Sequence, residues 1–298
     1  MECLNLPRTG FSKDTVIARP TVHLGGSTRP QSATITGTLG DDQLFGSFHA
    51  ETVDGLAGND TIFADSGDDL IYGNGPEGGF GDPLAGPGDN LIFAGLGNDT
   101  IFAGYQSDTV YGGDGDDSID GAGVFASSGA GGSITAARDF GDLLYGGAGQ
   151  DRIDGEGGSD TLFGGSGSDA LIGNLGRDEM TGGWGADVFH FAFRSAPGVF
   201  ASDTGTDAAT RDVILDFHPG QDRIDLQAYA NWTDGTQAPV FLGGGDFTGG
   251  SALQVRAVTE GDHTVVQFHV PFVFAPQPTT FEIELAGHHT LQASDFIF

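Results

Sequence analysis

Positive charge is the scarcest feature of this chain of 298 residues. It holds 11 Lys and Arg residues against 42 Asp and Glu, a formal net charge of −31, and its one lysine is Lys13. This acidic balance excludes nonspecific binding to nucleic acid and adhesion to anionic membranes. Carboxylates in such excess repel one another unless cations neutralise them, so we expect the metal-free chain to be expanded and its folding to be coupled to metal binding.

Cysteine and long apolar segments are nearly absent as well. The single cysteine, Cys3, cannot form an internal disulfide. Residues 1–30 hold no apolar run of about 7–15 residues behind a basic start, so the sequence predicts no Sec-type signal peptide. No stretch of about 18 apolar residues exists, so no membrane-spanning helix is expected. Secretion would therefore need a route that does not use the N-terminus.

Glycine and aspartate, by contrast, recur with a period of nine. From Gly146 the frames run GGAGQDRID, GEGGSDTLF, GGSGSDALI, GNLGRDEMT and GGWGADVFH, and the preceding frame ARDFGDLLY keeps the aspartate and the leucine. The residue at position 6 is Asp142, Asp151, Asp160, Asp169, Asp178 and Asp187 in turn; the residue at position 8 is Leu144, Ile153, Leu162, Leu171, Met180 and Phe189. A fixed short period predicts a solenoid whose units bury their apolar residues by stacking. A disordered Gly/Asp-rich tract is disfavoured by the fixed phase and by 23 phenylalanines.

Each frame predicts a tight turn followed by a minimal strand. Glycines at positions 1, 2 and 4 permit a turn with outward-facing carbonyls, and in the last three residues the central side chain points inward while its neighbours point outward. Two frames make one coil, so every second turn stacks on the same edge. We expect Asp142, Asp160 and Asp178 to line one edge, and Asp151, Asp169 and Asp187 to line the other.

Stacked carboxylates and turn carbonyls form an all-oxygen environment that favours a hard cation, and calcium suits it better than magnesium. The predicted turn glycines of the strongest block are Gly146, Gly147, Gly149, Gly155, Gly157, Gly158, Gly164, Gly165, Gly167, Gly173, Gly176, Gly182, Gly183 and Gly185. Two earlier blocks, 37–72 and 85–120, bring the total to fourteen frames. Their position-6 aspartates are Asp42, Asp60, Asp69, Asp99, Asp108 and Asp117.

Two frames of the earlier blocks are degenerate. Asn90 offers one acceptor oxygen and no charge, and Glu51 carries an extra methylene. We expect weak or no binding there, and about six to ten calcium ions in all, concentrated in 137–190. The insertions 73–84 and 121–136 between the blocks are either tolerated surface excursions or a lip that recognises a partner.

The flanks of the repeats are expected to cover the ends of the solenoid. Residues 1–36 predict an N-terminal cap, and the roll itself spans 37–190. In 191–298 the period stops and alternating segments predict strands. These segments are 212–217, 223–226, 264–270 and 281–285. The sequence therefore predicts an all-β protein.

The consensus G-G-x-G-x-D-x-U-x is that of the RTX calcium-binding proteins. GGWGADVFHF (182–191), RDVILDFHPGQDRIDL (211–226) and ELAGHHTLQASDFIF (284–298) resemble the C-terminal region of serralysin-type RTX proteins, and the terminal Asp295-Phe296-Ile297-Phe298 resembles that family's ending. The resemblance implies a right-handed parallel β-roll continued by an antiparallel β-sandwich cap with a type I secretion signal. It also implies export by an ABC transporter complex, unfolded in the low-calcium cytosol, and folding outside the cell or at its surface.

Catalytic signatures of the family's enzymes are missing from the sequence. There is no H-E-x-x-H, and Gly164-Gly165-Ser166-Gly167-Ser168 fails the nucleophile elbow G-x-S-x-G at its last position. His288 and His289 are expected on opposite faces of a strand, which disfavours a shared metal.

Three functions stay open at this point. The first is a non-catalytic scaffold for self-assembly, surface attachment or an extracellular partner. The second is the export-and-folding module of an extracellular enzyme such as a protease, lipase or polysaccharide-modifying enzyme. The third, an enzyme, would use acidic pairs such as Asp212/Asp216 or Asp222/Asp225, which are ordinarily structural at strand ends.

Overall fold

The computed structural model describes most of the repeat region and most of the C-terminal region. The described residues are 17–18, 33–75, 88–122, 140–196, 199–231, 233, 237–271 and 279–298. Most of the predicted N-terminal cap 1–36 and of the insertions 73–84 and 121–136 lies outside them. No helix in the described part of the chain is long and apolar enough to cross a membrane.

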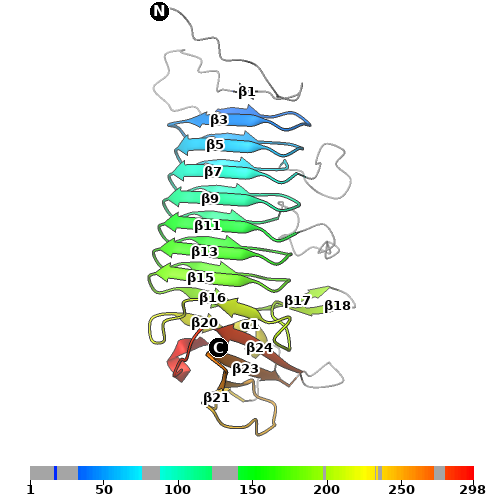
Figure 1. Ribbon diagram of the computed structural model, residues 1–298, viewed down its shortest axis with the longest axis vertical. Helices are drawn as coiled ribbons and strands as arrows, with labels where there is room; N and C mark the ends of the chain where they lie inside the picture. The colour runs from blue at the N-terminus through cyan, green and yellow to red at the C-terminus, as the bar shows by residue number, and fades with distance from the viewer. Residues whose placement is uncertain are drawn as a thin grey trace, which may run out of the picture.

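Two long sheets stack coil upon coil along one axis (Figure 1). The thirteen-stranded sheet contains, in order, β1 (Ile17–Ala18), β3 (Gln43–Ser47), β5 (Thr61–Ser66), β7 (Leu91–Leu96), β9 (Thr109–Asp114), β11 (Leu143–Ala148), β13 (Thr161–Ser166), β15 (Glu179–Trp184), β19 (Asp212–Ile214), β24 (Thr279–Leu285), β23 (His263–Val270), β22 (Gln254–Glu260) and β21 (Val240–Phe241). The ten-stranded sheet contains β2 (Thr34–Thr36), β4 (Thr52–Asp54), β6 (Leu70–Tyr72), β8 (Thr100–Phe102), β10 (Ser118–Asp120), β12 (Arg152–Asp154), β14 (Ala170–Ile172), β16 (Val188–His190), β20 (Arg223–Asp225) and β25 (Phe296–Ile297).

Strand register in the roll follows the nine-residue period. Successive frames alternate between the two sheets, so each strand pairs in parallel with the strand two frames on; Leu162 of β13 lies opposite Met180 of β15, and Leu171 of β14 opposite Phe189 of β16. The predicted parallel β-roll is therefore confirmed.

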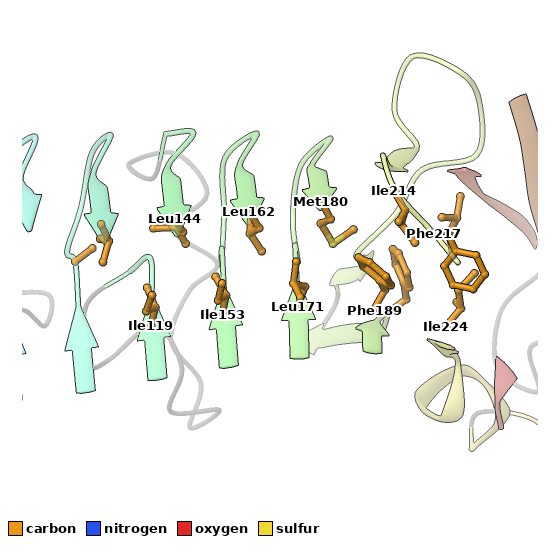
Figure 2. Close-up of a cluster of buried hydrophobic side chains, with 14 of the residues drawn as sticks. Ile119, Leu144, Ile153, Leu162, Leu171, Met180, Phe189, Ile214, Phe217 and Ile224 are labelled. Carbon is orange, nitrogen blue, oxygen red and sulfur yellow. The ribbon is translucent and has the colours of Figure 1, made fainter. Parts of the chain in front are cut away.

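The core is a double row of position-8 side chains from the two facing sheets (Figure 2). Leu144, Leu162 and Met180 of one sheet meet Ile153 and Leu171 of the other, and each is fully buried. A position-8 side chain therefore leaves water only when the coils on either side of it are formed.

Position 9 points outward, and in the thirteen-stranded sheet it builds an aromatic ladder. Neighbouring rings stack with centroids 4.7–5.3 Å apart and planes within 9°. The ladder consists of Phe45, Phe63, Phe93, Tyr111, Tyr145 and Phe163. These rings supply an attraction between coils that needs no ion.

The C-terminal region continues both sheets of the roll. β19 pairs in parallel with β15, and β20 with β16. The antiparallel part predicted from the sequence is β22–β23–β24, which joins the roll through the parallel pair β19–β24. A hairpin, β17 (Phe193–Ala196) and β18 (Val199–Ser202), and two short helices, α1 (Gln227–Ala230) and a 3-10 turn (Ala293–Asp295), complete it.

The four predicted strand segments of this region are confirmed, but the expectation for the paired histidines is wrong. His288 and His289 follow β24 outside any strand. His289 is held by the hydroxyl of Thr264, which accepts its backbone N–H at 2.8 Å, and by the carbonyl of Ala286, 2.7 Å from Nε2.

Both predicted insertions fall inside a turn, between its first residue and its position-6 residue. They do not fall between two complete nine-residue frames. A Cβ added to Gly121 would lie 2.5 Å from Oδ2 of Asp142, and one added to Gly73 would lie 2.7 Å from Nδ2 of Asn90. Gly73 and Gly121 therefore hold position 1 of the turns that end at Asn90 and Asp142. The contiguous frames read from the sequence placed these positions at Ala85 and Ala137, which lie outside the described residues.

Candidate calcium sites

Position-6 side chains form two columns, one on each edge of the roll. Edge A comprises the turns that run from the thirteen-stranded to the ten-stranded sheet and carries Glu51, Asp69, Asp99, Asp117, Asp151, Asp169 and Asp187. Edge B comprises the turns that run back and carries Asp42, Asp60, Asn90, Asp108, Asp142, Asp160 and Asp178.

From Asp60 on edge B and Asp69 on edge A onward, one oxygen of each carboxylate is used to join the coils. The backbone N–H of Asp151 donates to Oδ1 of Asp169 at 2.9 Å, and the N–H of Asp169 donates to Oδ1 of Asp187 at 2.9 Å. The same bond recurs along edge B, where the N–H of Asp160 donates to Oδ1 of Asp178 at 2.9 Å. These bonds fix every carboxylate in the same orientation.

The second oxygen is buried and has no hydrogen-bond partner within the described residues. It is Oδ2 of Asp60, Asp69, Asp99, Asp117, Asp151, Asp169, Asp178, Asp187 and Asp212. A buried charged oxygen left without a partner costs about 1–3 kcal/mol or more. A repeated column of such atoms therefore marks a place where positive charge belongs.

Backbone carbonyls converge on the same space. A Cβ built on Gly146 would lie 2.4 Å from Oδ2 of Asp151 and 2.6 Å from the carbonyl oxygen of Gly164 in the next coil. Gly164 repeats this arrangement with Asp169 and Gly182, at 2.5 and 2.6 Å. Position 1 must be glycine here because a side chain would enter the space toward which the oxygens point.

The remaining predicted glycines differ by position: those at positions 2 and 4 shape the turn, and those at position 1 face the carboxylate. Gly147, Gly165 and Gly183 at position 2 have φ of +97° to +121°. The position-4 glycines also have positive φ and lie against the carbonyls of the neighbouring coil; they are Gly149, Gly158, Gly167, Gly176 and Gly185. Position-1 glycines Gly155, Gly173 and Gly182 lie against Asp160, Asp178 and Asp187. Gly157 at position 3 pairs with Leu175.

The degenerate frame at Asn90 shows what replaces a cation. Its Oδ1 accepts the backbone N–H of Asp60 at 3.1 Å, as an aspartate would. Its Nδ2 donates to the carbonyls of Ala103, at 3.1 Å, and Gly88, at 3.3 Å. Ala103 holds position 1 of the next edge B turn. In the other turns the position-1 carbonyl of the next coil lies near a carboxylate, but here it accepts a hydrogen bond from the amide of Asn90. This layer satisfies its carbonyls without an ion.

Glu51, the other degenerate position, is satisfied by the protein in a different way. Its Oε2 accepts the backbone N–H of Ser47 at 3.0 Å and its Oε1 accepts the hydroxyl of Ser47 at 2.5 Å. The longer side chain thus bends back onto its own turn, where Ser47 takes both oxygens.

The pKa values of the column carboxylates also indicate that positive charge is missing beside them. Burial, and after it the neighbouring carboxylates of Asp42, Asp41 and Asp54, raise the pKa of Asp60 to about 8. Burial also raises the pKa of Asp117 and of Asp169 to about 7. The metal-free fold therefore holds its carboxylates in surroundings that resist ionisation.

A hard, oxygen-seeking divalent cation fits this donor set, which consists of carboxylate and carbonyl oxygens. No three His, Cys, Asp or Glu side chains in the described ranges come together so that they could hold a metal through side chains alone. Backbone carbonyls must therefore supply much of the coordination, as the glycine turns allow. A bound calcium ion would supply the positive charge that the second carboxylate oxygens face.

Two column residues were not among the predicted ligands. The N–H of Asp178 donates to Oδ1 of Asp212 at 2.9 Å, and the N–H of Asp187 donates to Oδ1 of Asp222 at 3.1 Å. Each is followed two residues later by a fully buried isoleucine, Ile214 or Ile224, as in the repeat; the residue between is exposed at Arg223 but buried at Val213. That signal was available in the sequence, but the missing glycine turn concealed it.

The acidic pairs considered for catalysis, Asp212/Asp216 and Asp222/Asp225, make separate structural contacts. Asp216 accepts the N–H groups of Gly182 and Gly183 at 2.9 and 2.8 Å. Oδ2 of Asp225 lies 2.9 Å from Nδ1 of His190. Each partner of these pairs thus has its own structural contact.

Acidification should favour the metal-free fold. Burial raises the pKa values of Asp60, Asp117, Asp151 and Asp169 to about 6–8 in the fold, against an ordinary value of 3.8. The folded chain therefore binds more protons than the unfolded one between about pH 4 and pH 8, so stability is gained as pH falls through this window and lost as it rises. In calcium-free buffer, far-UV circular dichroism should gain β signal from about pH 8 to pH 5. Calcium affinity should fall over the same range, because protons compete for the same oxygens; an unchanged spectrum and affinity would contradict both points.

Comparison with known proteins agrees with this geometry. The family profile of the RTX calcium-binding nonapeptide repeat (4 copies) matches residues 32–62, 45–75, 84–119, 137–171 and 163–192. No curated protein matches the chain.

Three solved structures are similar to parts of it. The AlgE6R3 subunit of the Azotobacter vinelandii mannuronan C5-epimerase is 30% identical, over 62% of this chain and 79% of that one, with a TM-score of 0.31. The AlgE6R2 subunit of the same enzyme is 28% identical, over 64% and 91%, with a TM-score of 0.26. The extracellular lipase LipA from Serratia marcescens is 13% identical, over 89% and 42%, with a TM-score of 0.19. On the strength of the repeats, the chain belongs to the family of proteins with RTX calcium-binding nonapeptide repeats.

Proposed function

We propose that this protein is a secreted, non-catalytic scaffold whose β-roll folds when it binds calcium outside the cell. The observation that carries the proposal is the double column of buried carboxylates, because at the nine residues named above the second oxygen has no hydrogen-bond partner in the described part of the chain. In a chain of net charge −31, such columns oppose folding until cations enter. Calcium concentration thereby becomes the signal that separates the unfolded from the folded chain.

The position of the C-terminus supports export before folding. Phe296 and Ile297 form β25, which pairs with Ile224 and Asp225 of β20. Asp295 is buried and accepts the N–H groups of Gly220 and Gln292, at 2.9 and 2.7 Å. An ABC transporter complex that reads this terminal segment must therefore do so while the chain is unfolded. In the low-calcium cytosol the columns would keep it so.

The folded roll is suited to a structural or interaction role. Its coils present a continuous, regularly spaced surface that could support self-association or attachment to an extracellular partner. The buried acidic groups of the described repeats act in joining coils and facing cations, which supports a role without catalysis.

A calcium titration of the whole chain tests the proposal. Far-UV circular dichroism and hydrodynamic radius should show compaction with new β signal at about 10⁻⁴–10⁻³ M calcium, the range of extracellular modules. Magnesium at equal concentration serves as the control and should be far less effective, because it demands a tighter octahedron and keeps its waters. A chain that is already compact and β-rich in chelator at neutral pH would refute the calcium-coupled switch.

A further inference from the structure

The two carboxylate columns end differently where the repeats stop. On edge A the last member, Asp222, is satisfied by the protein. Its Oδ1 accepts the N–H of Asp187 at 3.1 Å and its Oδ2 accepts the N–H of His218 at 2.8 Å. In addition, Nδ1 of His218 lies 3.6 Å from the same oxygen, Oδ2 of Asp222. This end of the column needs no ion.

On edge B the last member, Asp212, is not satisfied in this way. Its Oδ1 accepts the N–H of Asp178, but its Oδ2 has no hydrogen-bond partner among the described residues, and the residue is 0% exposed. The preceding residues 207–211 (DAATR) contain no glycine, so the turn lacks the repeat's carbonyl-presenting conformation. Some other oxygen must therefore take the place of the glycine carbonyls.

Asp203 is held near Asp212 through its neighbour in sequence, Thr204. The hydroxyl of Thr204 donates to the carbonyl of Glu282 at 2.6 Å and accepts the N–H of Asp212 at 3.1 Å, which fixes this segment beside Asp212. Asp203 is 1% exposed, and its Oδ2 accepts the N–H of Ala192 at 2.5 Å. Its charge and that of Asp178 both raise the pKa of Asp212, whose burial is the largest cause of the shift.

The positive charge next in sequence is already committed. Arg211 is buried and its guanidinium binds Glu282, Glu284 and Glu260 at 2.9, 2.9 and 3.3 Å. Its Nη2 also lies 3.1 Å from Nε2 of His263. Arg211 therefore neutralises the glutamates of β22 and β24 rather than Asp212.

We propose that Asp203 and Asp212 bind one further divalent cation, of the calcium class, at the junction between the roll and the C-terminal region. The site lies outside the repeats, since Asp203 belongs to no frame, and backbone oxygens would complete the coordination. An ion here joins the segment after β18 to the last coil and so makes docking of the C-terminal region depend on calcium. This inference rests on the proposed calcium-dependent folding.

Ion counting on the full chain tests it. Native mass spectrometry at saturating calcium should find one ion fewer in Asp203→Asn and in Asp212→Asn than in the wild-type chain. Asparagine at 203 can still accept the N–H of Ala192, so that variant is expected to fold. Asp262→Asn, in the exposed turn between β22 and β23, makes the same change of charge and should keep the full ion count.

Asp203→Asn is the deciding variant, because Asp212 also contributes to the last repeat contact. An unchanged ion count in folded Asp203→Asn overturns the proposal, whatever Asp212→Asn does, and leaves a shared proton between the two carboxyl groups as the explanation. A wild-type chain that binds no calcium would instead overturn the proposed function, and the two failures are thus distinguishable.

Discussion

Asp169→Ala should destabilise the calcium-bound fold by about 2–5 kcal/mol, because it leaves a buried donor unpaired and removes a cation ligand. The donor is the N–H of Asp151, which loses its acceptor 2.9 Å away. The lost ligand is Oδ2, which points with the carbonyl of Gly182 toward the space beside Gly164. Urea unfolding at one fixed calcium concentration measures the change. The calcium concentration at which half of the chain is folded should rise as well. This rise should be smaller than the loss of stability alone suggests, because many ions bind in the same folding transition.

Two further variants separate the roles of the two oxygens. Asp169→Asn keeps an acceptor for Asp151 and gains a donor for the carbonyl of Gly182, as Asn90 does for Ala103. It should lose an ion yet fall between wild type and Asp169→Ala in stability. Asn90→Ala removes hydrogen bonds but no ion and should cost less than Asp169→Ala. Equal losses for Asp169→Ala and Asn90→Ala would show that Asp169 has no special part in ion binding.

Gly167→Ala is expected to be among the most damaging additions of a single methyl group to the roll. Gly167 has φ of +144°, and a Cβ there would lie 1.5 Å from the carbonyl oxygen of Gly149. The obstacle is backbone, so the two coils would have to move apart and break the bond that the N–H of Gly149 donates to the carbonyl of Ser166 at 2.8 Å. Strain and overpacking together should cost about 3 kcal/mol or more. Urea midpoints at saturating calcium check this.

Gly261→Ala is the matched control for backbone strain. Gly261 also has positive φ, +63°, but a Cβ there meets nothing within 4 Å. Its substitution should cost about 1–2 kcal/mol from the left-handed conformation alone. If both variants lose the same stability, close stacking of turns is not the reason for glycine at position 4.

The nine-residue period was sufficient to predict the roll because one frame determines a turn, a strand and a direction for each side chain. Leu162 and Met180 are core residues for the same reason that Asp169 and Asp178 lie in columns. The period could not locate position 1 of the interrupted turns, since Gly73 and Gly121 are separated in sequence from the aspartate or asparagine they contact. Nor could composition show that Asn90 donates to a carbonyl, because that depends on the neighbouring coil.

Beyond the repeats, contacts between distant segments decide the structure. Asp212 and Asp222 resemble position-6 residues in their following strands, but only their pairing with Asp178 and Asp187 reveals it. The parallel pairing of β19 with β24 joins residues about seventy positions apart. Local alternation predicts such strands but not their partners.

The interrupted turns give the roll a tolerance for added length. The rise between coils is set by strand pairing and by the turn residues that contact the neighbouring coil, not by residues inserted between positions 3 and 4. Gly73 and Asn90 keep their contact across the first interruption, and Gly121 and Asp142 keep theirs across the second. Both interruptions leave and return on edge B, whereas the described turns of edge A are continuous. A foreign peptide grafted between positions 3 and 4 of an edge B turn should therefore leave the register of every other coil intact, which makes this edge the natural place to display a sequence on the roll.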